Sequence, residues 1–183
     1  MSNNGYPLLM IDLFSGLGGA SRAMTERDWE VVRVDNNSKF KPTVLVDIHE
    51  FSWKGRRPNL IWASPPCQEF ARWIMPWFPK TEPSLDLVKE AIRVIEECKP
   101  QFWVIENVRG AISWFKPLLG NYKVHYGPIF LWGNFPDLGN LQLGKGWKMK
   151  IGGNYPERRA IIPYAISEAL ACAIEQELLV STK

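Results

Sequence analysis

Short apolar segments recur at intervals through the first half of the sequence, and this alternation constrains the fold more than any other feature. Each segment has the length of a β-strand, and each ends in or is followed by a glycine or a polar residue. The segments are residues 7–14, 30–35, 43–47, 59–63 and 101–107. Strands that alternate with helices along a chain favour a parallel sheet with helices on both faces. We therefore expect an α/β fold built on a doubly wound, mostly parallel sheet.

Three stretches between and after these segments predict helices. The clearest is 83–100, where apolar residues recur at helical spacing and Ser84 is suited to cap the first turn. Its apolar positions are Leu87, Val88, Ala91, Ile92, Ile95 and Cys98. Residues 21–29 and 163–179 also predict helices, the latter with Pro163 near its first turn.

The pattern is weaker in the third quarter of the chain. Residues 111–119 favour a short helix that is broken at Pro117, and residues 122–136 favour one or two strands around a Gly-Pro turn. Because the sequence has no linker and no internal repeat, we expect a single domain over 1–183, with a short loop-rich segment at 127–157.

The composition is that of a globular protein, since 46% of the 183 residues are apolar and 22% are charged. No uninterrupted apolar run reaches the length of about 18 residues that a membrane-spanning helix needs, so no membrane association is expected. The three cysteines and two histidines lack metal-binding spacing, which favours a reduced, cytoplasmic protein without a structural metal. The net charge is only +3, but basic residues cluster at 54–58, 145–150 and 157–159, a composition that suits a phosphate backbone.

Glycine and polar residues gather where the predicted strands end. They are Gly16 to Gly19, Asp35, Asp47, Cys67 and Glu106. The carboxyl ends of parallel strands share one edge of a sheet, and ligands bind at that edge near the switch in strand order. Their convergence predicts a site more strongly than any one of these residues does.

The turn "SGLGG" at 15–19 follows a predicted strand and precedes a predicted helix, so its backbone can approach a bound cofactor. Ser21 stands where the dinucleotide fingerprint has its third glycine. Asp35 is placed to accept hydrogen bonds from ribose hydroxyls, and Asp47 to reach an adenine amino group. An ordinary cap or turn is the alternative for each aspartate, but together they favour an adenosine-containing cofactor.

Cys67 lies in "ASPPCQEF", where two prolines stop the preceding strand and fix the pose of the next residue. It is either a nucleophile or a buried cysteine beside an ordinary turn. Glu106 ends a strand of apolar residues, a setting that favours the protonated carboxyl group and suits a proton donor, with a structural carboxylate as the alternative. If the two strands are neighbours, a six-membered ring between these side chains can be attacked at one atom and protonated at another.

Three blocks in this order, "DLFSGLGGASRAM", "ASPPCQEF" and "VIENVRG", resemble the signature motifs of the cytosine-5 DNA methyltransferases. The resemblance covers residues 8 to 110, and the last helix is similar to the family's final cofactor-side segment. It implies S-adenosylmethionine as the cofactor and a cytosine in DNA, flipped out of the duplex, as the substrate.

The resemblance also implies roles for individual residues. Phe14 would stack on the adenine, Gly16, Leu17, Gly18 and Gly19 would surround the methionine part, and Asp35 with Asn36 would hold the ribose side. Asp47 and Ile48 would contact the adenine, and Pro66 would shape the loop of the nucleophile Cys67. Glu106 would bond to nitrogen 3 of the cytosine, and Asn107 would brace the surroundings of Glu106. Gln68 and Asn107 would belong to the substrate side of the site.

The chain departs from the family pattern in three places. Only residues 127–157, about thirty in number, stand where a target-recognition region is usual, too few for a domain with its own core. The arginine-bearing strand that contacts the base is missing, so Arg158 or Arg159 is expected to substitute for it. Ala71 stands where a serine is usual. The compact form resembles phage-type members, from a bacterial or phage-infected host cell.

These observations favour a cytosine-5 DNA methyltransferase whose target recognition is minimal or comes from a protein partner or oligomer. The alternative is a cofactor-binding or nucleic acid-binding subunit that is inactive alone. Methylation of RNA or of single-stranded DNA is a third reading, because the same ring chemistry serves both.

Overall fold

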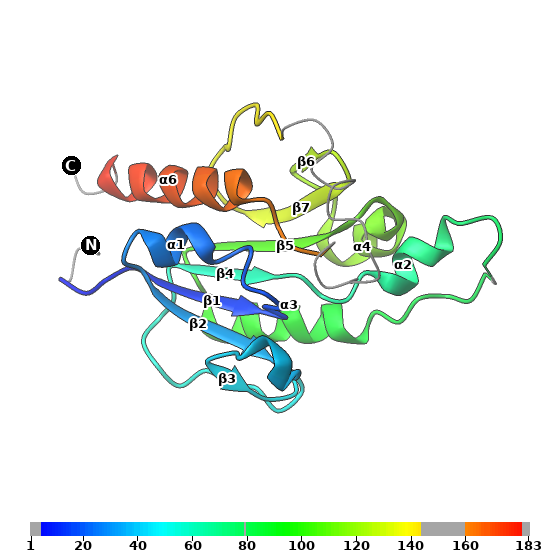
Figure 1. Cartoon of the computed structure of the whole chain (residues 1–183), viewed down its shortest axis with the longest axis horizontal. Coiled ribbons are helices and arrows are strands. Elements are labelled where there is room, and N and C mark those ends of the chain that lie inside the picture. Colours follow the sequence, from blue (N-terminus) through cyan, green and yellow to red (C-terminus); the bar gives the residue numbers. More distant parts are fainter. Residues whose placement is uncertain (1–4, 79, 144–159, 181–183) are drawn as a thin grey trace.

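The structure is a computed structural model that describes residues 5–78, 80–143 and 160–180. A seven-stranded sheet forms its centre, in the order β3-β2-β1-β4-β5-β7-β6 (Figure 1). The strands are β1 Leu9–Leu13, β2 Glu30–Asp35, β3 Val44–Leu45, β4 Leu60–Ala63, β5 Phe102–Val108, β6 Val124–Tyr126 and β7 Ile129–Asn134. The first five are parallel where they pair, whereas β7 runs antiparallel to β5 and β6. The sheet is therefore mostly parallel, as the sequence predicted.

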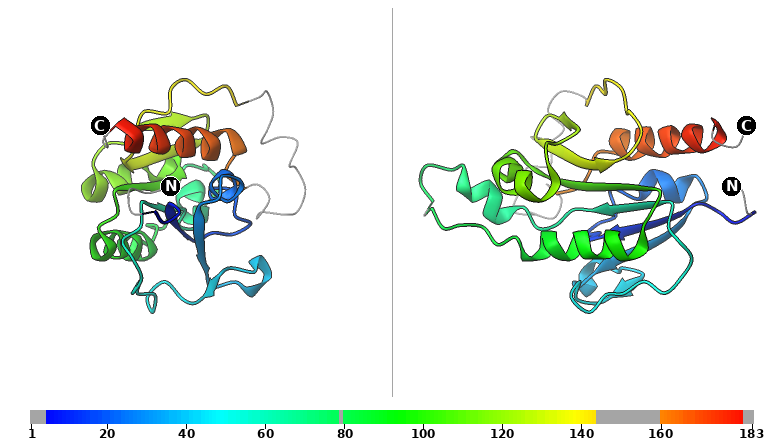
Figure 2. Two further views of the ribbon diagram at one scale, coloured as in Figure 1. Left: turned by 90° about the vertical axis from the view of Figure 1, so that its left-hand side faces the viewer. Right: turned by 180° about the vertical axis from the view of Figure 1, so that it is seen from behind.

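Helices cover both faces of the sheet, as Figures 1 and 2 show. The helices are α1 Arg22–Glu26, α2 Gln68–Trp73, α3 Asp86–Cys98, α4 Ile112–Leu119 and α6 Tyr164–Val180, with short 3-10 turns η1 Ser38–Phe40 and η2 Arg109–Ala111. The expected doubly wound α/β fold is confirmed.

Alternate residues of the central strands pack into two separate cores. Met10, Trp62 and Val104 lie on the side of α1 and α6. Leu9 and Ile61 lie on the opposite side, with α3. All five residues of β1 are buried because helices cover both of its faces.

Several predicted elements differ from the structure in their bounds. The helix predicted over 83–100 begins at Asp86; Leu85 occupies the cap position, although the Ser84 hydroxyl still accepts a hydrogen bond from the Asp86 backbone at 3.2 Å. The strand predicted over 43–47 ends at Leu45. Helix α2 was not predicted, because its six residues are too few to show a helical repeat in the sequence.

Two predictions for the third quarter of the chain need correction. Pro117 does not break α4, which continues to Leu119 because the proline lies in the last turn and removes only one late hydrogen bond. The segment 127–157 is not loop-rich from its start, since β7 pairs with both β5 and β6. One or two strands were predicted around the Gly-Pro turn, and the structure has two there, β6 and β7. Arg158 and Arg159, like the basic cluster at 145–150, lie outside the described residues.

None of the described helices combines the length and apolarity that crossing a bilayer requires.

Candidate functional site

A cavity of about 440 Å³ lies at the carboxyl ends of β1, β2, β4 and β5. Its lining comes from segments far apart in sequence: residues 12, 14–17, 19–20, 35–37, 40, 64–68, 106, 108, 129 and 160–162. Among the predicted site residues, Phe14, Gly16, Leu17, Gly19, Asp35, Asn36, Pro66, Cys67, Gln68 and Glu106 all border it. The edge at which the sequence predicted a ligand site therefore carries a cavity.

The glycine turn and the end of β2 are joined through Asp35. One carboxylate oxygen accepts the backbone N–H of Gly16 at 2.9 Å, and the other accepts that of Asn37 at 2.9 Å. Each oxygen keeps a lone pair, so the side chain can accept further hydrogen bonds from a ligand in the cavity. Asp35 is thus fixed in orientation at the lining.

The glycines of this turn meet different constraints. A Cβ at Gly19 would lie 2.8 Å from the Ile162 backbone nitrogen, so only glycine lets the chain that enters α6 close over the turn. Gly18 does not line the cavity; it has a φ of +75°, and a Cβ there would approach the Arg33 guanidinium at 3.1 Å. The turn therefore combines cavity lining with close backbone packing.

Cys67 and Glu106 come from neighbouring strands. Strands β4 and β5 are parallel partners whose last pair is Ala63 with Ile105, so Glu106 is the first residue of β5 beyond the end of β4, where the Cys67 loop begins. Both side chains are half-buried and line the same cavity. The expectation that the two strands are neighbours is confirmed, and both side chains belong to one cavity.

Asn107 ties these two strand ends together. It is fully buried; its side-chain amide donates to the Pro65 carbonyl oxygen at 3.0 Å, and its own carbonyl accepts the Val108 backbone N–H at 2.9 Å. It does not line the cavity. Asn107, predicted to brace the surroundings of Glu106 and to lie on the substrate side, therefore holds the proline loop that carries Cys67.

A second contact fixes the helix that follows Cys67. A Cβ at Gly110 would lie 2.1 Å from the Phe70 carbonyl oxygen, so η2 touches the backbone of α2 directly. Phe70 is buried and meets Phe115 edge to face, with ring centroids 5.1 Å apart. The start of α2, and with it Cys67, is held against the end of β5 from two sides.

The sequence model of the C-5 cytosine-specific DNA methylases matches residues 8–116, which contain the glycine turn, Cys67 and Glu106. The chain belongs to this family. Its curated relatives include the type II methyltransferase M.SacI of Streptomyces achromogenes, 29% identical over 68% of this chain and 43% of that protein. The "Probable DNA (cytosine-5)-methyltransferase" of Frog virus 3 is 27% identical over 68% of this chain and 65% of that protein.

The fold of the chain is similar to that of a solved methyltransferase structure. A "putative DNA modification methyltransferase" encoded within a prophage (E. coli) superposes with a TM-score of 0.51 at 20% identity, over 69% of this chain and 46% of that one. The sheet order and this likeness establish the fold of S-adenosylmethionine-dependent methyltransferases. The chain spans less than two thirds of the length of the curated relatives named above.

Asp12 is a site residue that the motif-based reading missed. It is 1% exposed, lines the cavity and accepts the Ser21 hydroxyl at 2.6 Å. Burial raises the pKa of this carboxyl group to about 7, against the lowering effects of the Ser21 hydrogen bond and of Arg33. The signal in the sequence was a lone carboxylate inside the apolar run "LLMIDLF". Ser21, which stands where the fingerprint has its third glycine, is the residue that donates this hydrogen bond to Asp12.

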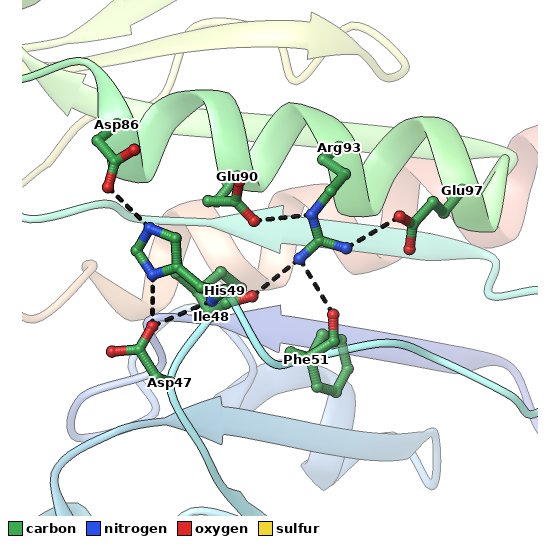
Figure 3. A network of polar contacts seen from close by, with 8 residues as sticks. All are labelled: Asp47, Ile48, His49, Phe51, Asp86, Glu90, Arg93 and Glu97. Carbon is green, nitrogen blue, oxygen red and sulfur yellow. Dashed lines mark hydrogen bonds and ion pairs between the residues drawn. The ribbon is translucent and has the colours of Figure 1, made fainter.

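Asp47 and Ile48 do not line the cavity. Asp47 turns toward His49, whose ring lies 2.6 Å from Asp47 and 2.7 Å from Asp86 at the start of α3 (Figure 3). Hydrogen bonds from the His49 backbone and ring lower the pKa of Asp47, and the Asn36 side chain also bonds to it. Ile48 is buried, and its carbonyl accepts from Arg93 at 2.9 Å.

The cavity fits a polar cofactor in one further respect. The Ser15 hydroxyl is buried at the lining and has no hydrogen-bond partner among the described residues. A buried polar group without a partner points to a ligand that supplies one. The described residues hold no cluster of three or more side chains arranged to bind a metal ion, and Cys67, Cys98 and Cys172 form no disulfide.

Proposed function

We propose that the chain transfers a methyl group from S-adenosylmethionine to carbon 5 of cytosine in DNA, through a covalent adduct with Cys67. The observation that carries the proposal is that Cys67, after the end of β4, and Glu106, on the neighbouring strand β5, line one cavity together with the glycine turn and Asp35. Family membership supports the same chemistry, whereas the activity of the whole protein is inferred, because the chain spans only part of its relatives' length.

Cys67 and Glu106 divide the work on the cytosine ring. Carbon 5 of cytosine is a poor nucleophile. The Cys67 thiolate forms a bond to carbon 6 while Glu106 gives a proton to nitrogen 3, so the ring's electron pair moves toward carbon 5 as an enamine. S-adenosylmethionine supplies an electrophilic methyl group to that carbon. Loss of the carbon 5 proton then re-forms the double bond to carbon 6 and expels the Cys67 thiolate.

The structure supports some of the predicted cofactor-binding residues more strongly than others. Asp35 faces the cavity with both oxygens oriented by backbone N–H groups, which suits it to bind ribose hydroxyls. Phe14, Gly16 and Gly19 line the same space, consistent with contacts to the adenine and the methionine part. Contact of Asp47 and Ile48 with the adenine stays a prediction, and neither residue lines the cavity.

Asn107 and Gly110 act on the geometry of the reaction rather than on the base. Together they fix the proline loop and α2 against the end of β5, so the distance between Cys67 and Glu106 is set by buried contacts. The attacking thiolate and the proton donor must reach two specified ring atoms at the same time. A small displacement of either group therefore lowers the reaction rate.

Target recognition is proposed to come from outside the described cavity. The region between β7 and α6 has few residues, so a protein partner, a second copy of the chain or a further segment would read the sequence around the cytosine. A subunit that binds cofactor or nucleic acid and needs such a partner for catalysis is the alternative function.

The test is methyl transfer from a labelled cofactor to duplex DNA, single-stranded DNA and RNA. The proposal predicts label at carbon 5 of cytosine in duplex DNA, loss of transfer in Cys67→Ala, and full transfer in Cys172→Ala, a matched cysteine on α6 that does not line the cavity. Cofactor binding without transfer would favour the subunit. Transfer that survives Cys67→Ala would overturn the covalent mechanism.

A further inference from the structure

The glycine turn has a backbone conformation that needs support from its neighbours. Phe14 is not a glycine, yet its φ is +56°, and Gly16 follows with a φ of +48°. A residue with a side chain rarely adopts such an angle, and it keeps the angle only where surrounding contacts fix the backbone. Both residues line the cavity, so the contacts that fix the turn also fix this part of the cavity wall.

Three successive residues at the end of β2 hold the turn. The Val34 carbonyl oxygen accepts the Ser15 backbone N–H at 3.1 Å. The Asp35 carboxylate accepts the Gly16 backbone N–H at 2.9 Å. The third residue, Arg33, binds the carbonyl side of the glycine, since its guanidinium Nη2 donates to the Gly16 oxygen at 2.5 Å. Gly16 is therefore held at both its N–H and its carbonyl group.

Arg33 also binds a second segment of the cavity lining. The same Nη2 donates to the Phe40 carbonyl oxygen of η1 at 3.1 Å, and Phe40 lines the cavity. Arg33 itself does not line it. Hydrogen bonds from a charged donor are stronger than those between neutral groups. One cationic nitrogen thus joins the glycine turn to η1 from behind the cavity wall.

The guanidinium group packs closely under the turn. A Cβ at Gly18 would lie 3.1 Å from the Arg33 Nε, so the lack of a side chain at Gly18 leaves room for the guanidinium. This Nε is buried and has no hydrogen-bond partner among the described residues. A buried cation whose donors are only partly satisfied contributes little net stability to a fold. Its placement therefore points to a role in the geometry of the cavity.

We propose that Arg33 is a positioning residue for the cofactor, which holds Gly16 and Phe40 at the separation that the bound cofactor requires. The inference rests on the proposed function for the identity of that cofactor. Arg33 belongs to none of the three motif blocks that resemble the family, and it acts through the backbone of lining residues. Without it the two segments lose their common partner, so ligand binding must fix their positions and the affinity falls.

Calorimetric titration with S-adenosylhomocysteine, in the absence of DNA, tests the proposal without catalysis. Arg33→Met keeps an unbranched side chain but removes the donors. This variant should bind about tenfold more weakly than the wild type, the effect of losing one hydrogen bond from a charged donor. Arg33→Lys should recover part of the affinity, because an ammonium group can also donate to two carbonyl oxygens.

Arg57→Met is the matched control. Arg57 also donates to two backbone carbonyl oxygens, those of Lys99 and Pro100, but it does not line the cavity or contact a residue that does. This variant should bind S-adenosylhomocysteine as the wild type does. Hydrogen exchange of the ligand-free proteins, followed by mass spectrometry, gives a second readout. Exchange should be faster in Arg33→Met than in the wild type within 14–20 and 37–42, and unchanged there in Arg57→Met.

Unchanged affinity or unchanged exchange in Arg33→Met would overturn the inference. Equal losses of affinity in Arg33→Met and Arg57→Met would do so too, because they would show a general structural effect, and so would an Arg33→Lys variant as weak as Arg33→Met. Absence of binding by the wild type would overturn the inference together with the proposed cofactor. The proposed function has a separate readout, the transfer of label to cytosine. Binding that depends on Arg33 without any methyl transfer would refute only the function.

Discussion

Replacing Asp12 with asparagine should stabilise the ligand-free protein at alkaline pH, because the folded state buries this carboxyl group almost completely. Burial raises its pKa from 3.8 to about 7. Between about pH 4 and about pH 7 the folded state holds a proton that the unfolded chain has released, so stability falls as the pH rises through this range and stays low above it. At roughly 1.4 kcal/mol per pH unit, this interval corresponds to about 4 kcal/mol.

Asparagine keeps the shape and removes the ionisation, and its amide oxygen can still accept the Ser21 hydroxyl. Urea unfolding of wild type and Asp12→Asn at pH 4.5 and pH 8, without cofactor, measures the effect. The variant should gain on the order of 4 kcal/mol relative to wild type at pH 8 and little at pH 4.5. Asp28→Asn, an exposed aspartate after α1, serves as control. Parallel pH profiles of wild type and Asp12→Asn would refute the reasoning.

Three further substitutions test other parts of the account. Gly19→Ala should lower the unfolding free energy by about 1–3 kcal/mol and weaken cofactor binding by calorimetry, because the new Cβ meets the backbone that enters α6; unchanged binding would contradict this. Asn107→Ala removes the hydrogen bond to Pro65 and should lower the single-turnover rate by at least about tenfold while cofactor affinity is kept; a loss confined to cofactor affinity would argue against its positioning role. The hydrogen bond to Asp47, followed by that to a carboxylate on α3, raises the pKa of His49. The stabilisation by the hydrogen bonds between His49 and these two carboxylates should be complete below about pH 6.5 and decline as the pH rises through the raised pKa. The melting temperature of His49→Gln should therefore depend less on pH over that range than the melting temperature of the wild type. A pH profile unchanged by the substitution would exclude this stabilisation.

The strands and the pairing of Cys67 with Glu106 could be predicted from the sequence for a simple physical reason. Central parallel strands are buried on both faces, so they appear as continuous apolar runs whose ends are easy to locate. The strand over 30–35 has the predicted bounds. Because each run ends at the same edge of the sheet, the residues that follow them meet there. Asp35, Cys67 and Glu106 meet there for this reason.

The remaining features depend on contacts between distant segments, which local patterns do not contain. The role of Asn107 depends on the Pro65 carbonyl, 42 residues away. Asp47 turns away from the cavity because His49 and α3 supply its partners. Asp12 lies on the face of β1 that α1 and α6 cover. Its burial could therefore be recognised only once the position of the terminal helix was known. Helix α2 is too short to show a helical period.

The central claim is that the Cys67 sulfur bonds to carbon 6 of a cytosine extruded into the cavity. The most direct test is mass spectrometry of the protein after incubation with S-adenosylmethionine and DNA in which cytosine is replaced by 5-fluorocytosine, since fluorine blocks the final elimination and traps the adduct. The account predicts a covalent protein–DNA complex whose nucleotide is attached to the peptide that contains Cys67. An adduct on Cys98 or Cys172, or methylated DNA that accumulates with no adduct, would contradict it.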